Sequence, residues 1–445
     1  MTPLTVGFVP IARSTFDIPL AEDMTRRVWE ALQGANVTLV GSQALVLNAE
    51  DVETTLNQFE GQAFDALLVL QASFADSTML MQVAAQIDAP LILWALPEAH
   101  TGGRLRLNSF CGINLGGHAL RRAGKAYDYI YAEPEDAAAL EKVRQVATAA
   151  AVRRKLQGAR IGRVGEHPDG FETCAFDADA LRDTFGVDVV QLTLEAVFEA
   201  ARQADPVAVE AVQQSLSARV VGLGDLDADA VRGTLSTYVT LRDTRQAQSL
   251  DGFAVRCWPQ FFTDLGCAAC GSSSMLNDEM IPSSCEADVN GTLTQLMLQW
   301  VSDAPVFGSD IVSFDDEAET VILWHCGKAP LSMADPSQPP STTVHSNRGM
   351  PLLMQFTLKP GRVTLARLSE AEGTYRLVIG GGEMIAAPPA FSGTVGTLRP
   401  DGGAMNLLDT LLGEGLEHHV AVAYGDHIAT LETLARMLNV PVLRL

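Results

Sequence analysis

The chain is poor in positive charge. Its 445 residues include 31 Lys and Arg against 54 Asp and Glu, which gives a formal net charge of −23 at pH 7. Nucleic acids and anionic membranes repel such a polyanion unless it carries a basic patch, and the sequence contains no cluster of Lys and Arg. We therefore expect neither a nucleic acid nor a membrane as a partner.

Long apolar runs are also missing. Residues 66–70 and 90–94 are typical of the longest runs, and both fall far short of the roughly 20 residues that a membrane helix needs. The first 17 residues do not combine a basic region with an apolar core, so they do not resemble an export signal. Seven cysteines, an odd number, are typical of reduced thiols rather than of a disulfide framework. These features predict a soluble cytoplasmic protein.

The common catalytic motifs are absent. The sequence has no P-loop, no G-x-G-x-x-G fingerprint after a strand, no H-E-x-x-H and no G-x-S-x-G elbow. Its one C-x-x-C, from Cys267 to Cys270, has no second pair at a spacing suited to a structural zinc. We interpret these two cysteines as ordinary thiols.

The first two thirds of the chain alternate strands and helices. Short apolar runs at residues 4–9, 37–40, 66–70 and 90–94 are separated by stretches of helical periodicity, and a second such series begins at residue 160. This alternation indicates parallel sheets covered on both faces. Ligands of such sheets bind at the loops that follow the carboxyl ends of strands. Among the residues in these loops are Arg13, Phe74, Arg104 and Arg106.

The last third has a different pattern. Apolar and polar residues alternate around residues 354–358 and 363–365, with a Lys-Pro-Gly-Arg turn between them, as in antiparallel strands. At roughly 100–200 residues per domain, the length suggests about three domains. We predict two consecutive Rossmann-like α/β domains, residues 1–157 and 158–300, followed by a β-rich, antiparallel barrel-like domain, residues 301–445.

Two acidic residues in this region are candidates for chemistry. Glu286 lies in Cys-Glu-Ala-Asp-Val-Asn-Gly, which opens a predicted helix, and the positive end of a helix dipole favours an ionised carboxylate there. Taken alone, a simple capping acid explains it better. Asp310 follows a short predicted strand at residues 305–307 and begins another apolar run. A carboxylate at the mouth of a buried strand costs free energy unless it is paired or binds a cation; a turn aspartate is the alternative.

Two histidines complete the set. His325 ends one predicted strand, and His419 immediately precedes another at residues 420–423. A single histidine at a strand end is more often structural than a ligand. Two carboxylates with one or two histidines, in a chain without other catalytic motifs, nevertheless favour a metal site. Oxygen and imidazole ligands suit Mn²⁺, Mg²⁺ or Co²⁺ and also hold Zn²⁺, and three protein ligands leave positions open for substrate oxygens.

These residues resemble the L-fucose isomerase and L-arabinose isomerase superfamily. In L-fucose isomerases a glutamate at an E-x-x-x-x-N-G helix start precedes an aspartate by 24 residues. Here Glu286 begins E-A-D-V-N-G, one residue shorter, and Asp310 lies 24 residues later. The third ligand of that family is a histidine before a short apolar strand that ends in Tyr-Gly, which is similar to His419 ahead of Tyr424 and Gly425.

The resemblance implies roles for further residues. Arg13 occupies the place of an arginine that holds substrate, and residues 256–260, which end at Gln260, look like a substrate-contacting strand end. His325 is the counterpart of a metal-binding histidine in arabinose isomerases, and serves either as a fourth ligand or as a group that orients substrate. N-terminal domains of the family cap a neighbour's site, which implies a homo-oligomer, by resemblance a hexamer.

The activity implied by this resemblance is a metal-dependent aldose–ketose isomerisation of a free sugar through a cis-enediol, with Mn²⁺ the first choice of metal. Glu286 and Asp310 would share the proton transfers and bind the metal together with His419. The groups expected to hold substrate are Arg13, Phe74, Gln260 and His325. The chain is shorter than typical L-fucose isomerases, which leaves the sugar open. The alternatives are a modified or anionic hexose, such as a sulfosugar bound by Arg13, Arg104 or Arg106, or a non-catalytic sugar-binding protein.

Overall fold

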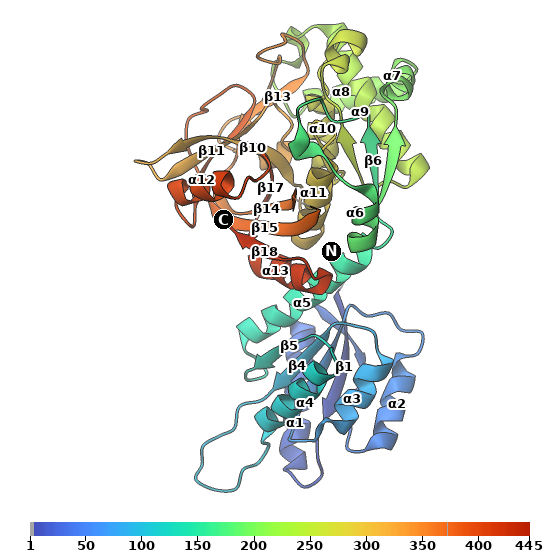
Figure 1. Ribbon diagram of the computed structural model, residues 1–445, viewed down its shortest axis with the longest axis vertical. Coiled ribbons are helices and arrows are strands. Elements are labelled where there is room, and N and C mark those ends of the chain that lie inside the picture. Colours follow the sequence, from blue (N-terminus) through green and yellow to red (C-terminus); the bar gives the residue numbers. More distant parts are fainter. Residues whose placement is uncertain (1–3, 372) are drawn as a thin grey trace. The chain divides into compact units, whose positions relative to one another are not determined.

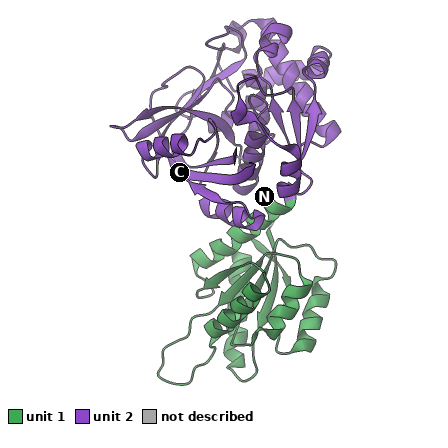
Figure 2. Ribbon diagram, viewed as in Figure 1, with its two compact units in different colours: residues 1–154 green, residues 155–445 purple. Residues whose placement is uncertain are grey.

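The computed structural model describes residues 4–371 and 373–445. The chain divides into two compact units, Met1–Arg154 and Lys155–Leu445 (Figure 2). Within the described residues, no helix combines the length and the apolar character needed to cross a membrane.

Unit 1 is built on a five-stranded parallel sheet in the order β2-β1-β3-β4-β5 (Figure 1). Its central strand β3 is buried along its whole length, as expected when helices cover both faces of a parallel sheet. The strands are β1 (Leu4–Ile11), β2 (Val37–Gly41), β3 (Ala66–Gln71), β4 (Leu91–Ala95) and β5 (Tyr127–Tyr131). The helices are α1 (Ile18–Gly34), α2 (Ala49–Phe59), α3 (Ser77–Gln86), α4 (Ser109–Arg122) and α5 (Ala137–Leu156).

Unit 2 begins with a second parallel sheet, in the order β7-β6-β8-β9. Its strands are β6 (Arg160–Val164), β7 (Asp188–Leu192), β8 (Gly252–Val255) and the very short β9 (Ser283–Ser284). The helices of this part are α6 (Ala178–Phe185), α7 (Leu194–Arg202), α8 (Pro206–Ser217), α9 (Ala228–Gln248), α10 (Cys270–Asp278) and α11 (Val289–Ser302). The loops after β8 and β9 leave the same edge of the sheet, because the two strands are parallel neighbours.

The remainder of unit 2 is an antiparallel barrel. Six strands follow one another as β16-β11-β10-β17-β14-β15, and pairing of β15 with β16 closes the ring. They are β10 (Phe307–Asp315), β11 (Thr320–His325), β14 (Gly361–Ala371), β15 (Thr374–Ile385), β16 (Thr394–Pro400) and β17 (His419–Tyr424). The flanking elements are β12 (Ser341–Thr343), β13 (Leu353–Thr357), β18 (Val442–Arg444), α12 (Ala404–Gly413) and α13 (Ile428–Leu438). The predicted fold class, α/β sheets followed by a β-rich barrel, is confirmed.

One hydrophobic core joins the two parts of unit 2. Phe253 of β8, Phe307 of β10 and Leu365 of β14 belong to the same buried cluster. Helix α11 packs against β8 on one side and against β14 and β17 of the barrel on the other (Figure 1). The segment that leads into α11 is thereby held between the edge of the parallel sheet and the barrel strands.

Two local predictions are wrong. Helix α11 begins at Val289 with Asp288 as its N-cap, so Glu286 lies in the loop ahead of the helix rather than in its first turn. Asp310 does not follow a strand that ends at residue 307; it lies inside β10, which continues to Asp315 through an irregularity between Ile311 and Ser313. The polar pair Ser309 and Asp310 interrupts the apolar pattern, while backbone pairing with both neighbouring strands continues.

Candidate active site

Three neighbouring barrel strands bring three predicted residues together. Asp310 of β10 is the direct cross-strand partner of His419 on β17. On the other side of β10, Asp310 pairs with Trp324 of β11, and His325 is the next and last residue of that strand. Residues more than 100 positions apart in the chain therefore meet at one place on the barrel, because directly opposed residues on antiparallel strands are close neighbours.

Glu286 reaches the same place from the parallel sheet. It follows β9 and has a left-handed backbone, with φ of 58°, as does Ala287 with φ of 54°. Such conformations of residues other than glycine cost of order 1–3 kcal/mol and are concentrated at functional sites. The indole Nε1 of Trp258, in the loop after β8, donates a hydrogen bond to Glu286 Oε1 at 3.1 Å. The tight loop and this bond fix the direction of the carboxylate.

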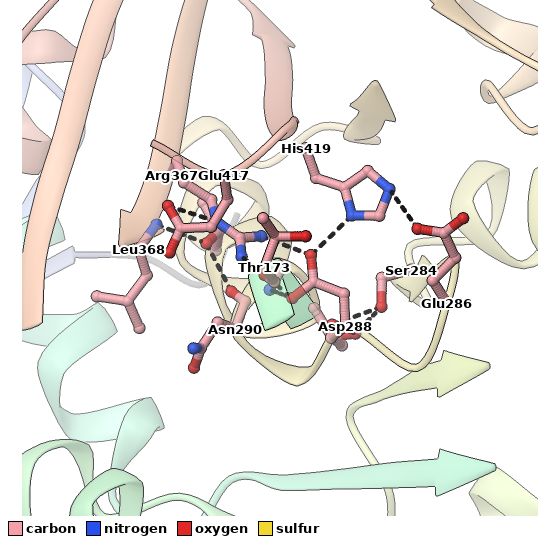
Figure 3. A network of polar contacts seen from close by, with 12 residues as sticks. Thr173, Ser284, Glu286, Asp288, Asn290, Arg367, Leu368, Glu417 and His419 are labelled. Atoms are coloured by element: carbon pink, nitrogen blue, oxygen red, sulfur yellow. Dashed lines mark hydrogen bonds and ion pairs between the residues drawn. The ribbon is translucent and has the colours of Figure 1, made fainter. Parts of the chain in front are cut away.

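The ring of His419 lies between carboxylates, as Figure 3 shows for Asp288 and Glu286. Its Nδ1 is 2.9 Å from Asp288 Oδ2. An ionised carboxylate can only accept, so Nδ1 carries a proton and donates it to this bond. The lone pair of the neutral ring is then at Nε2, which is 3.7 Å from Glu286 Oε2 and 3.5 Å from Asp310 Oδ1. A carboxylate behind a histidine is the usual way in which proteins orient a metal-binding imidazole.

A buried ion pair holds Asp288 in turn. Asp288 and Arg367 of β14 lie 2.5 Å apart with side chains 0% and 3% exposed, and Glu417 lies 3.7 Å from the guanidinium. Asp288 also caps α11 by accepting from the backbone N–H of Gly291 at 2.7 Å. Burial raises the pKa of Asp288, but the charge of Arg367 and the hydrogen bond from His419 outweigh it, so the pKa lies well below its usual range. Asp288 is a permanently ionised support.

The two candidate catalytic carboxylates have opposite electrostatic environments. Burial raises the pKa of Glu286, but the hydrogen bonds from His418, at 3.1 Å, and from Trp258 lower it by more, so the net pKa shift is downward. The pKa of Asp310 is raised, chiefly by burial. Two nearby acids whose pKa values are pushed apart are typical of acid–base catalysis.

His325 is 5% exposed, and one of its ring nitrogens is hydrogen-bonded to the backbone. Its Nδ1 accepts the backbone N–H of Cys326 at 2.9 Å. Burial lowers the pKa of His325 well below its usual range, so the ring is neutral and its proton is on Nε2. Neither nitrogen then offers a free lone pair. Of the two roles expected for His325, this arrangement favours a hydrogen-bond donor over a metal ligand.

Lys328 places a buried cation beside these groups. Its side chain is 2% exposed, and it lines a small cavity of about 10 Å³ together with Ser284, Asp288 and His419. Among residues 4–371 and 373–445, the structure gives its ammonium group no ion-pair or hydrogen-bond partner. Its positive charge lowers the pKa of the Asp310 carboxyl and the pKa of His325. An unpaired buried ammonium is costly, so its position calls for a functional explanation.

A divalent cation suits this arrangement. Asp310 Oδ1 is buried and accepts no hydrogen bond from any described residue, although its neighbours are polar. It lies beside the His419 Nε2 lone pair and close to Glu286, which supplies the second carboxylate. Two carboxylates and one imidazole form a donor set for Mn²⁺, Mg²⁺ or Co²⁺. Cys174 is near Glu286 and the two histidines, but burial raises its pKa, which keeps the thiol protonated and unsuited to bind a metal.

The residues expected to hold substrate fall into separate groups. Arg13 and Phe74 belong to unit 1, where Arg13 follows β1 and Phe74 follows β3. The Arg13 guanidinium lies 5.9 Å from the Phe74 ring centroid. Gln260 belongs to unit 2 and accepts from Arg256 Nε at 3.0 Å. Of the alternative cations, Arg106 is paired with Asp17 at 2.9 Å, and Arg104 donates to the Thr15 carbonyl at 3.3 Å.

Sequence reasoning missed several residues of the site. Asp288 was visible only as part of the Glu286 motif, although its spacing to Gly291 is that of an N-cap. No feature of the sequence distinguishes His418 from its neighbour His419 as a candidate. Arg367 and Lys328 carry no local signal, because their importance arises from burial beside groups that are distant in the chain.

Two family models match this chain. A family model described as "Fucose/sulfoquinovose isomerase, N-terminal domain" matches residues 7–159, and one described as "L-fucose isomerase, C-terminal domain" matches residues 323–445. A sulfoquinovose isomerase of Priestia aryabhattai is 32% identical over 443 residues, which cover 99% of this chain and 98% of the relative. Sulfoquinovose isomerases of Alkalicoccus urumqiensis and of Clostridium sp. (strain MSTE9) are 31% and 30% identical over 444 residues, 99% of this chain and 99% and 98% of the relatives.

Fold and relatives together define an aldose–ketose sugar isomerase. The chain belongs to the fucose/sulfoquinovose isomerase family, as its resemblance to L-fucose isomerases implied. This result favours the enzyme over the non-catalytic sugar-binding protein.

Proposed function

We propose that this chain is a divalent-metal-dependent isomerase that interconverts the aldose and ketose forms of a sulfosugar through a cis-enediol. The observation that carries the proposal is the convergence of Glu286 and Asp310 on the Nε2 lone pair of His419, with Asp310 Oδ1 left without a hydrogen bond from the described residues. The sulfosugar is favoured over L-fucose because relatives named sulfoquinovose isomerase match almost the whole chain. We expect Mn²⁺ to be the metal.

Glu286, Asp310 and His419 would hold the metal. Its chemistry, when bound, is to polarise the sugar carbonyl and stabilise negative charge on the C1 and C2 oxygens. This role needs a histidine with a fixed lone pair, which the bond from His419 to Asp288 supplies. It also needs carboxylates with room for a further ligand, which fits Asp310.

The proton transfers fall to the two acids. Isomerisation moves one proton between C2 and C1 and another between the two oxygens, which positioned carboxylates perform. The lowered pKa of Glu286 suits a base that is ionised at neutral pH. The raised pKa of Asp310 suits a group that accepts a proton and returns it. We assign the carbon-bound proton to Glu286 and the oxygen-bound proton to Asp310.

Two neutral or cationic groups assist. His325 would donate its Nε2 proton to a substrate oxygen, because its Nδ1 is committed to the backbone. The ammonium group of Lys328 would stabilise the negative charge that develops as the enediol forms. Gln260 would contact sugar hydroxyls beside Trp258. The substrate-binding roles of Arg13 and Phe74, the homo-oligomeric assembly and the cytoplasmic location stay predictions.

A panel of sugars tests the proposal. Purified protein is stripped with a chelator and assayed for ketose formation from sulfoquinovose, L-fucose and D-glucose, with and without added Mn²⁺. We expect negligible turnover without metal and the highest kcat/KM for sulfoquinovose with it. A preference for L-fucose would overturn the substrate, and full activity of the stripped protein would overturn the metal dependence.

A further inference from the structure

A tight turn lies beside the Trp258 side of the site. Residues 345–350 fold back on themselves, with His345 N–H donating to the Met350 carbonyl at 2.9 Å and the Arg348 and Gly349 N–H groups donating to the His345 carbonyl at 3.1 and 2.7 Å. Gly349 has φ of 69°, a conformation that favours glycine. The His345 ring packs edge-on against Phe262 at 5.3 Å. The turn is therefore a closed structure with a defined position.

This turn holds Arg348 over two aromatic rings. The guanidinium carbon lies 5.2 Å from the ring centroid of Trp258 and 5.0 Å from that of Phe262. The side chain is exposed, and it has neither an ion-pair nor a hydrogen-bond partner in the part of the chain that the structure describes. Contact with aromatic faces orients a guanidinium while its N–H donors stay available. In a chain with a net charge of −23, such a cation is available to an anionic ligand.

Trp258 connects this cation to the reacting groups. Its Nε1 donates to Glu286 Oε1 at 3.1 Å, and the same indole carries Arg348. A single indole side chain thus separates the guanidinium from the carboxylate assigned to the carbon-bound proton. An open-chain hexose is of similar length to an indole, so a sugar with C1 and C2 at Glu286 can extend its far end towards Arg348.

Other cations near the site are either paired or buried. Arg256 donates to Gln260 at 3.0 Å and to the Glu166 carbonyl at 3.2 Å. Arg367 is buried against Asp288. Lys328 lines the small cavity behind His419.

We propose that Arg348 binds the sulfonate group at C6 of the substrate and thereby determines the preference for a sulfosugar over a neutral sugar. This inference rests on the proposed function. A sulfonate carries one negative charge on three oxygens, and a guanidinium can donate two parallel N–H bonds to two of them. Because the contact is remote from C1 and C2, it contributes to substrate binding and leaves the proton transfers to Glu286 and Asp310.

The test compares Arg348→Gln and Arg348→Lys with the wild type on sulfoquinovose and on its 6-deoxy analogue, which lacks the sulfonate. Loss of a charge-assisted hydrogen bond typically lowers affinity about 10- to 100-fold. We expect Arg348→Gln to raise KM for sulfoquinovose by about this factor with kcat nearly unchanged, and to leave kcat/KM for the analogue within about twofold. Arg348→Lys, which keeps the charge but not the bidentate donors, should fall between the two.

Arg232→Gln is the matched control, because Arg232 is an exposed arginine of α9. It should behave as the wild type with both sugars. An unchanged KM for sulfoquinovose in Arg348→Gln, or an equal loss with the 6-deoxy analogue, would overturn the assignment of Arg348. Turnover of sulfoquinovose by the wild type tests the proposed function separately, so the two failures are distinguishable.

Discussion

Asp288 and Asp310 both lie beside His419, and their surroundings are opposite. Asp288 is fully buried and paired with Arg367, His419 and the N-terminus of α11. Asp310 is 22% exposed at its side chain, and its buried Oδ1 receives no hydrogen bond from the described residues. Their pKa shifts are opposite as well. Burial raises the pKa of both carboxyls, but in Asp288 the charge of Arg367 and the hydrogen bond from His419 outweigh burial, whereas in Asp310 the nearby charges, that of Lys328 among them, do not.

This difference separates support from chemistry. A buried carboxylate that is completely paired has no capacity left for a ligand, and it serves to position its neighbours. A buried carboxylate oxygen without a hydrogen-bond donor is electrostatically unfavourable, and a bound cation can compensate its charge. The same contrast distinguishes Arg367, which is paired and buried, from Lys328, which is buried and has no partner among the described residues. Asp310 and Lys328, which lack such partners in the described part of the chain, are the residues assigned to the reaction.

The largest expected effect is on the unsatisfied acids. Asp310→Asn and Glu286→Gln keep the shape of the side chains but remove a metal ligand and a proton acceptor. We expect each variant to lose at least about a thousandfold in kcat, within the range for a general base and beyond when metal binding also weakens. Steady-state assays at saturating Mn²⁺ measure this. The melting temperature of metal-free Asp310→Asn should not fall, since an unfavourable buried charge is removed. For either variant, activity within tenfold of the wild type at full metal occupancy would refute the catalytic role.

Asp288→Asn should instead destabilise the fold. It leaves Arg367 buried with only Glu417, at 3.7 Å, as a counter-charge, and breaking a buried ion pair typically costs about 3–5 kcal/mol. It also replaces the charged acceptor that fixes the His419 lone pair by a neutral amide, and loss of such support typically weakens metal binding 10- to 100-fold. Urea unfolding and Mn²⁺ titration measure the two effects.

The control for Asp288 is Asp401→Asn. Asp401 pairs with Arg362 at 2.5 Å, but its side chain is 48% exposed, so the loss should be under about 1 kcal/mol. Equal losses in the two variants would show that burial of the Asp288 pair is not what matters.

Lys328→Met should lower the activity and raise the stability. Removing a buried ammonium and keeping an unbranched apolar side chain should raise the free energy of unfolding by about 1–3 kcal/mol. We expect kcat to fall about tenfold, because the developing negative charge loses a nearby cation. Parallel urea unfolding and steady-state kinetics check the prediction, and a variant that is both less stable and fully active would contradict it.

Trp258→Phe should have the smallest effect. The ring that supports Arg348 is retained, but Glu286 Oε1 loses a donor at 3.1 Å. One hydrogen bond contributes about 1 kcal/mol, so kcat should fall by about fivefold. KM for sulfoquinovose should stay within twofold, and a KM effect larger than the kcat effect would show that the indole acts mainly through Arg348.

Much of the fold follows from local pattern. The strands β3 and β4 are predicted from sequence, because a strand that is buried on both faces is a continuous apolar run that can be recognised locally. Strand β10 is not, since Ser309 and Asp310 interrupt its apolar pattern while cross-strand pairing maintains it. Barrel closure by β15 and β16 likewise depends on pairing that local periodicity does not encode.

The candidate site divides in the same way. Spacing and family resemblance point to Glu286, Asp310 and His419, and the structure brings these three together. Asp288 and Arg367 are 79 positions apart, and the meaning of each depends on the other. The role proposed for Arg348 depends on its contacts with the rings of Trp258 and Phe262, which are distant from it in the sequence.

The most direct test of the account is anomalous diffraction from crystals grown with Mn²⁺. The account predicts one strong peak bounded by the Glu286 and Asp310 carboxylates and by His419 Nε2, with Asp288 and His325 outside the coordination sphere. A peak coordinated by Asp288, or no peak at this site in an enzyme that turns over sugar, would contradict it.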